Sequence, residues 1–144
     1  MGMIVKDLIS VSQVLDFLEN AKKYGNPIHS VIIAYSNNYD PTVVDALEDY
    51  TKIRMVPVNH NHGMNEVFKG LNISEKSSNE LLFSKPLAQG GLTPYGFNRN
   101  TVLMEAILLG CDVLVFIDSD VLPYVLVETE NGVEFEDVDF IGTH

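Results

Sequence analysis

The chain has 144 residues, 46% of them hydrophobic, a length and composition typical of one globular domain with its own core. Its formal net charge of −11 repels polyphosphate backbones, so we expect no nucleic-acid partner. No apolar run approaches the roughly 18 to 20 residues of a transmembrane segment, and the N-terminus lacks the pattern of a signal peptide. The single cysteine, Cys111, excludes an internal disulfide and favours a reducing, cytoplasmic location.

A helical pattern comes first along the chain. Ser10 and Gln13 have the spacing of a capping box, and the apolar residues that follow recur on one helical face. Gly25 and Pro27 end this pattern. The sequence therefore predicts an N-terminal helical extension over residues 1–27.

Two strands and a helix are predicted next. Residues 28–38 (IHSVIIAYSNN) form a strand whose centre is apolar on both faces. Asp40 and Pro41 are a good cap and first residue for the helix that follows. Residues 52–58 (KIRMVPV) form the second predicted strand, and Pro57 places it at an edge or a strand end.

The second half of the chain is less regular. Residues 59–72 are compatible with a short helix, residues 80–84 (ELLFS) with a third strand, and residues 85–98 with a loop rich in glycine and proline. Residues 99–110 then read as a helix that ends in a glycine. Residues 113–117 (VLVFI) follow as a strand apolar on both faces.

Apolar strands joined by apolar helices predict a Rossmann-like three-layer α/β sandwich with a mostly parallel central sheet. Asn131-Gly132 between two β-prone runs predicts a hairpin over residues 124–138. Residues 138–144 read as a further strand without the element that should cover it. We therefore expect residues 1–144 to be a single domain that is truncated, with an exposed edge that would allow a homo-oligomer.

Two aspartates follow the last apolar strand. Asp118 and Asp120 leave its carboxyl end, where open parallel sheets bind ligands. In an extended segment residues two apart point to the same side, so both carboxylates can address one point. Such oxygen ligands suit Mg²⁺ or Mn²⁺ combined with phosphates, and a cation would relieve their mutual repulsion. The alternative is an Asp-Ser-Asp turn that only ends the strand.

The ordered motifs around these aspartates resemble those of GT-A-fold nucleotide-sugar glycosyltransferases, especially the family-2-like group. Arg99-Asn100 begins a helix, Gly110-Cys111-Asp112 ends it, and a strand leads to Asp118-Ser119-Asp120. The resemblance spans about residues 28–122. It implies the N-terminal, donor-binding part of an enzyme that transfers a sugar from a nucleoside-diphosphate sugar to an unknown acceptor, with Mn²⁺ or Mg²⁺ as cofactor.

The resemblance also implies roles on the diphosphate side. Asp120, with Asp118, would hold the metal on the donor diphosphate. Arg99 would contact that diphosphate from a helix N-terminus, which itself favours anions. Read without the family, Arg99 is equally well a solvated arginine at the start of a helix.

On the nucleoside side, Ala34-Tyr35-Ser36-Asn37 is similar to the family's nucleoside-binding loop. Tyr35 would stack on the base and Asn37 would supply polar contacts; otherwise Tyr35 is a half-buried aromatic at a strand end. The family usually places an acidic residue after the next strand, where this chain has VNHNHG. Either Asn61 substitutes for the acidic residue there, or the base is held differently.

Other functions remain open. A haloacid-dehalogenase-like phosphotransferase also has an apolar strand followed by Asp-x-Asp. Its motif, however, continues with threonine or valine at the position where this chain has Leu122. A nucleotidyltransferase would need a glycine-rich phosphate loop after the first strand, and residues 34–41 (AYSNNYDP) contain no glycine. His60 and His62 could be metal ligands but have no third ligand at recognisable spacing. The family's acceptor-side residues generally follow Asp-x-Asp, so the catalytic residues are left unassigned and a non-catalytic nucleotide-sugar-binding half-domain is the further alternative.

Overall fold

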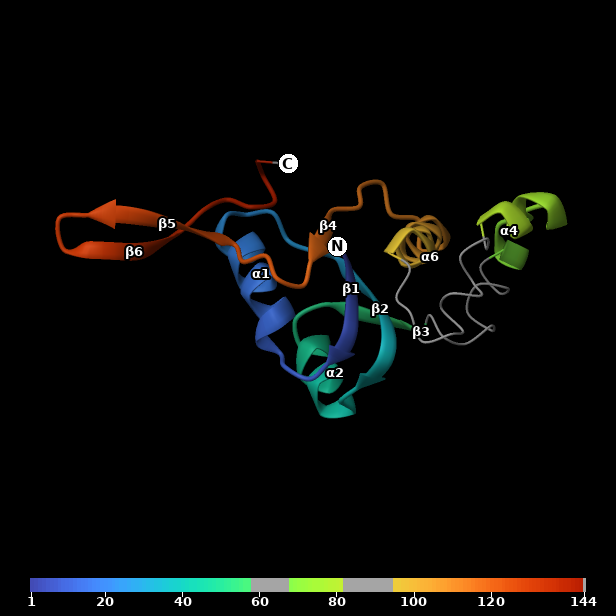
Figure 1. Ribbon diagram of the computed structural model, residues 1–144, viewed down its shortest axis with the longest axis horizontal. Coiled ribbons are helices and arrows are strands. Elements are labelled where there is room, and N and C mark those ends of the chain that lie inside the picture. The colour runs from blue at the N-terminus through green and yellow to red at the C-terminus, as the bar shows by residue number, and fades with distance from the viewer. Residues whose placement is uncertain (58–67, 82–94, 144) are drawn as a thin grey trace.

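The computed structural model describes residues 1–57, 68–81 and 95–143 (Figure 1). None of the helices in these ranges is long and apolar enough to cross a membrane. The elements in chain order are β1 (Gly2–Leu8), α1 (Ser12–Lys23), β2 (Ser30–Tyr39), α2 (Pro41–Glu48), β3 (Lys52–Pro57), α4 (Glu75–Leu81), α6 (Tyr95–Leu108), β4 (Phe116–Asp118), β5 (Tyr124–Thr129) and β6 (Gly132–Asp137).

A four-stranded parallel sheet forms the centre of the molecule, with strand order β3-β2-β1-β4. Ala34 of β2, Ile4 of β1 and Asp118 of β4 lie at the same level across it. Because all strands run in one direction, their carboxyl ends share one edge of the sheet. The predicted α/β class is confirmed, and the sheet is consistent with a Rossmann-like sandwich.

Strand β1 is a finding that the sequence did not predict. Residues 1–27 are not only a helical extension, because residues 2–8 form an inner strand between β2 and β4. Helix α1 follows, but it has no side-chain cap, so the expected capping box is wrong. Helix α6 packs closely on β1 at Gly2, where a Cβ atom would lie 2.5 Å from Val102 Cγ1.

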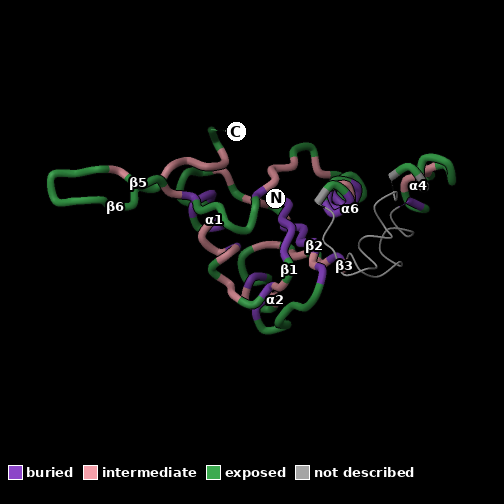
Figure 2. The backbone as a smooth tube through the Cα atoms, in the orientation of Figure 1, coloured by how far each residue is buried: buried purple, intermediate pink, exposed green. Residues whose placement is uncertain are grey.

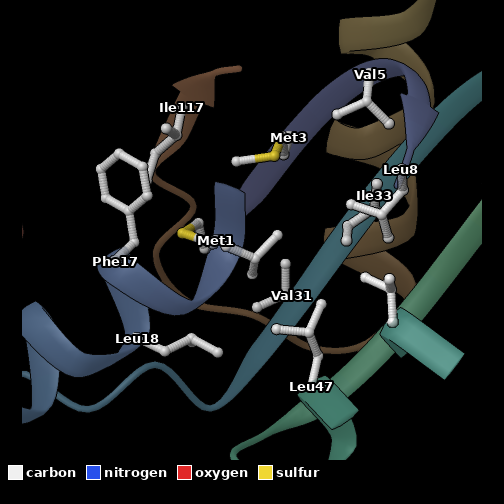
Figure 3. Packing of buried hydrophobic residues seen from close by; sticks show 12 residues of the cluster. Met1, Met3, Val5, Leu8, Phe17, Leu18, Val31, Ile33, Leu47 and Ile117 are labelled. Atoms are coloured by element: carbon white, nitrogen blue, oxygen red, sulfur yellow. The ribbon is translucent and has the colours of Figure 1, made fainter. Parts of the chain in front are cut away.

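Helices cover both faces of the sheet, as predicted. Successive residues of a strand point to opposite faces, so β1 and β2 supply side chains to two separate apolar clusters. Helix α6 closes the first cluster, which includes Ile4, Ile32, Ala34, Val56, Phe97 and Val102. Helices α1 and α2 close the second, where Phe17 lies beside Ile117 and Leu47 beside Val31 (Figure 3).

Local signals in the sequence set several element ends correctly. Gly25 and Gly110 follow α1 and α6 with φ of 79° and 69°, a conformation that glycine adopts without strain. After α6 the N–H of Cys111 donates to Ala106 O, and that of Gly110 donates to Ile107 O, as in a Schellman motif. Asp40 caps α2 by accepting from Thr42 N at 2.9 Å.

Other predictions were wrong. The expected strand 113–117 begins only at Phe116, and Val113 is 78% exposed. Among the described residues β4 pairs only with β1, at the edge of the described sheet. Glu80 and Leu81 belong to helix α4 and not to a strand, while the rest of 80–84 lies outside the described residues. Residues 138–143 form turns and irregular chain, with no strand.

The predicted hairpin is confirmed as β5 and β6, which are joined by Glu130 and Asn131, while Gly132 already belongs to β6. It projects from the sheet as an arm whose residues are mostly exposed (Figures 1 and 2). Its base is attached to α1, where the Asn20 amide donates to Pro123 O and Val138 O. Lys23 also forms an ion pair with Asp137. Polar contacts with α1 therefore hold the base of this arm.

Candidate functional site

An arginine and an aspartate meet at the carboxyl end of the sheet. Arg99, near the start of α6, donates from Nη2 to Asp118 Oδ1 of β4 at 3.2 Å. Its guanidinium also lies 5.7 Å from the centre of the Phe116 ring. Both charged side chains are about half exposed, at 51% and 56%, so solvent and ligands can reach the pair. An ion pair this exposed adds little stability, which leaves it free to exchange partners.

The two aspartates of the motif are separated by a turn. Val121 N donates to Asp118 O at 3.1 Å, which closes a tight turn over residues 118–121. The segment is therefore not extended, and the strand alternation expected to align Asp118 with Asp120 does not apply. Both side chains are exposed. Any convergence of the two carboxylates depends on the turn and on what binds there.

The residues present fit a divalent cation that arrives with phosphates. Within the described ranges no three His, Cys, Asp or Glu side chains gather as a metal cage. Asp118 and Asp120 offer accessible carboxylate oxygens, and Mg²⁺ typically takes one or two of these plus water and substrate phosphates. The donor set thus suits a shared metal–phosphate site. Arg99 already contacts one of these oxygens, so it would compete with a cation for Asp118.

A second polar group lies at the ends of β1 and β2. Asn37 Nδ2 donates to Asp7 Oδ1 at 2.9 Å, and Asn38 N donates to the same oxygen at 3.2 Å. Because β1 lies between β2 and β4, Asp7 is closer in strand order to Asp118 than Asn37 is. Asp7 was not among the site residues predicted from the sequence. An aspartate two residues after the apolar run MIV was the available signal.

The expected nucleoside residues divide between the two faces of the sheet. Ala34 is fully buried under α6, so only its backbone could contact a ligand. Tyr35 packs on the opposite face with the α1 and α2 cluster, and its ring centre lies 4.9 Å from that of Tyr39. Burial, and secondarily Tyr39, raise the pKa of Tyr35. The structure does not bring Tyr35 next to the Arg99–Asp118 pair, and Asn61, His60 and His62 lie outside the described residues.

Asn98 is a further residue that the sequence analysis passed over. It precedes Arg99 on α6 and is fully buried, and neither its Oδ1 nor its Nδ2 has a hydrogen-bond partner among the described residues. A buried amide without a partner costs about 1 to 3 kcal/mol. Its position one helical turn before the buried Val102 was a signal, because polar residues are uncommon on the inner face of a helix.

The carboxyl end of the sheet has an excess of negative charge, which favours the binding of a cation. Asp7, Asp118 and Asp120 outnumber Arg99 among the charged residues named here, in a chain that is itself strongly acidic. An anionic ligand would be repelled unless a metal came with it. Comparisons with models of protein families, with curated proteins and with solved structures found no match.

Proposed function

We propose that this chain binds the donor of a metal-dependent glycosyltransferase, which transfers a sugar from a nucleoside diphosphate to an unknown acceptor. The observation that carries the proposal is the contact of Arg99 with Asp118 at 3.2 Å. The order of motifs in the sequence assigned this arginine and this aspartate to the donor diphosphate. The two residues are neighbours at the carboxyl edge of the sheet. That edge is where open parallel sheets bind ligands.

Each residue of the pair has a separate task in this proposal. Asp118 and Asp120 hold Mn²⁺ or Mg²⁺, which when bound neutralises the charge that develops on the leaving diphosphate. Arg99 leaves Asp118 and turns its guanidinium to the diphosphate, a planar group suited to phosphate oxygens. The expected helix start at residue 99 was wrong, because α6 already includes Tyr95 and Arg99 is its fifth described residue. The dipole at a helix terminus acts within the first turn, so the guanidinium itself carries the attraction.

The corner between β1 and β2 is suited to the nucleoside. Asp7 accepts both of its hydrogen bonds on Oδ1, and no described residue bonds its Oδ2. Oδ2 can therefore accept hydrogen bonds from ribose hydroxyls, while Asn37 fixes the orientation of the carboxylate. This places the nucleoside over β1 and β2 and the diphosphate over β4.

Donor binding and sugar transfer are separable properties. A nucleotide-sugar-binding domain without catalysis would use the same residues, since the acceptor and the residues that act on it are not assigned. Binding is therefore the property to measure first. Transfer is measured afterwards as release of the nucleoside diphosphate from a nucleotide sugar.

The decisive experiment is calorimetric titration of UDP, and then GDP, with and without Mn²⁺. We expect binding that needs the metal and falls at least tenfold in Asp118→Asn, because one of the two metal carboxylates is lost. The matched control is Asp45→Asn, which removes an exposed carboxylate on α2 at no proposed site. Binding without the metal, or equal binding by the two variants, would contradict the assignment.

A further inference from the structure

A cavity lies at the amino ends of the strands, opposite to the edge that carries Asp118. Its volume is about 690 Å³, within the range of sites that enclose small organic ligands. It is lined by the residues at the starts of β1, β2 and β3 and by the chain that connects α6 to β4. The proposed donor site uses none of these residues.

The cavity wall is mainly apolar. Its apolar part comes from segments distant in sequence: Ile28, Ile53, Leu109, Cys111, Val115 and Ile141. Some of the backbone carbonyls in the last turn of α6 already have hydrogen-bond partners, because they accept from the N–H groups of Gly110 and Cys111. A hydrocarbon chain is therefore the chemistry that this wall accommodates best.

The cavity wall carries two cationic side chains and one acidic one. The chain has only nine Lys and Arg, yet Lys52 and Arg54 both line this cavity, with His29 beside them and Asp112 as the acid. Lys52 and Arg54 are two apart on β3 and so share the face toward α6, where Arg54 Nε donates to Glu105 Oε2 at 3.1 Å. Lys52 forms no ion pair with any described residue.

From this combination we infer that the cavity binds a small anionic amphiphile, a single hydrocarbon chain that ends in a carboxylate. The chain lies along the apolar wall and Lys52 pairs with the carboxylate. Charge complementarity supports this ligand, because Arg54 is paired with Glu105 while Lys52 lies on the apolar wall without an ion-pair partner among the described residues. The inference is independent of the proposed donor function.

Cys111 offers a direct reporter of occupancy. It is the single cysteine of the chain, it lies on the cavity wall and its side chain is partly exposed. Its alkylation rate by iodoacetamide, a neutral reagent, can be measured with and without decanoate below the concentration at which decanoate forms micelles. We expect saturating decanoate to slow alkylation at least fivefold, whereas decyltrimethylammonium of equal chain length leaves the rate unchanged.

Two charge reversals locate the carboxylate. Lys52→Glu should weaken the protection by decanoate about tenfold in concentration, since it removes one ion pair and adds a repulsion. Lys76→Glu, on exposed α4 outside the cavity, should leave the protection as in the parent protein. For each variant, the alkylation rate with decanoate is divided by the rate of the same variant without decanoate. A change in the reactivity of Cys111 itself therefore cancels.

Three results with the amphiphiles would overturn the inference. These are no slowing by decanoate, equal slowing by the cationic amphiphile, and equal protection in the Lys52 and Lys76 variants. A rate that falls with protein concentration in the absence of decanoate would also overturn it, because a second copy of the chain would then cover the cavity.

Discussion

The parallel sheet and the β5–β6 hairpin are stabilised in different ways. The side chains of the sheet are buried between helices, and Val31, Ile32 and Ile33 are fully buried. The hairpin leaves Phe135 71% exposed and Leu126 66% exposed, and a two-stranded hairpin alone is marginal in water. Hydrophobic burial therefore stabilises the first region, whereas hydrogen bonds and an ion pair to α1 position the second.

The largest expected effect is the difference in unfolding free energy between two Phe→Ala variants, one in the core under the sheet and one in the hairpin. Phe17→Ala removes a ring that is 1% exposed and packs edge-on against Phe140, so we expect a loss of about 3 to 5 kcal/mol in the free energy of unfolding. Phe135→Ala removes an exposed ring with an edge contact to Tyr124 and should cost less than about 1 kcal/mol. Urea unfolding of both variants measures this, and similar losses would refute the contrast.

A smaller effect concerns the attachment of the hairpin. The Asn20 amide donates to Pro123 O and Val138 O, and its Oδ1 accepts from Phe140 N. Asn20→Ala should cost about 1 to 3 kcal/mol, because buried backbone groups lose their partners. Hydrogen exchange should also accelerate at the Phe140 amide while that of the sheet stays slow.

The matched control for this attachment is the neighbouring exposed residue of α1. Glu19→Ala should change the free energy of unfolding by less than about 0.5 kcal/mol and leave exchange at the Phe140 amide as it was. If the two variants behave alike, the hairpin is not positioned by Asn20.

The smallest effect is a titration. Tyr124 at the start of β5 donates its hydroxyl to Asp16 Oδ2 of α1 at 2.9 Å, and this hydrogen bond, followed by burial, raises the pKa of Tyr124 above its ordinary 10.0. The stabilisation is complete below pH 10 and is lost as the pH rises through the folded-state pKa, since only the neutral phenol donates. Asp16→Asn should lower the pKa of Tyr124 in an NMR titration, whereas Asp45→Asn should leave it unchanged.

Part of the candidate site was accessible from the sequence. A helix that connects two parallel strands starts at the carboxyl ends of the strands. The sequence has Arg99 at the start of the predicted helix, Gly110 at its end and Asp118 after the next strand. It therefore predicts that Arg99 and Asp118 lie at the same, carboxyl edge of the sheet. The structure places the two side chains in contact. Asp7 was not found, since its strand was not recognised. Tyr35, which was expected to stack on the nucleoside base, packs against the cluster under α1 and α2.

The sequence by itself determined the features that depend on neighbouring residues. These are Gly25 and Gly110 after their helices, the Asp40-Pro41 start of α2 and Asn131-Gly132 at the hairpin turn and the start of β6. All act within a few residues, through backbone conformation and short hydrogen bonds. Such signals remain legible without knowledge of the rest of the chain.

Only the tertiary structure decided the order of the strands. Strand β1 includes Lys6 and Asp7 and follows no strong local pattern, yet it lies inside the sheet because β2 and β4 pair with it over long distances in sequence. Strand β4, which is apolar in sequence, lies at the edge of the described sheet. Local propensity cannot fix such positions, because the burial of a strand depends on which partners the whole fold supplies.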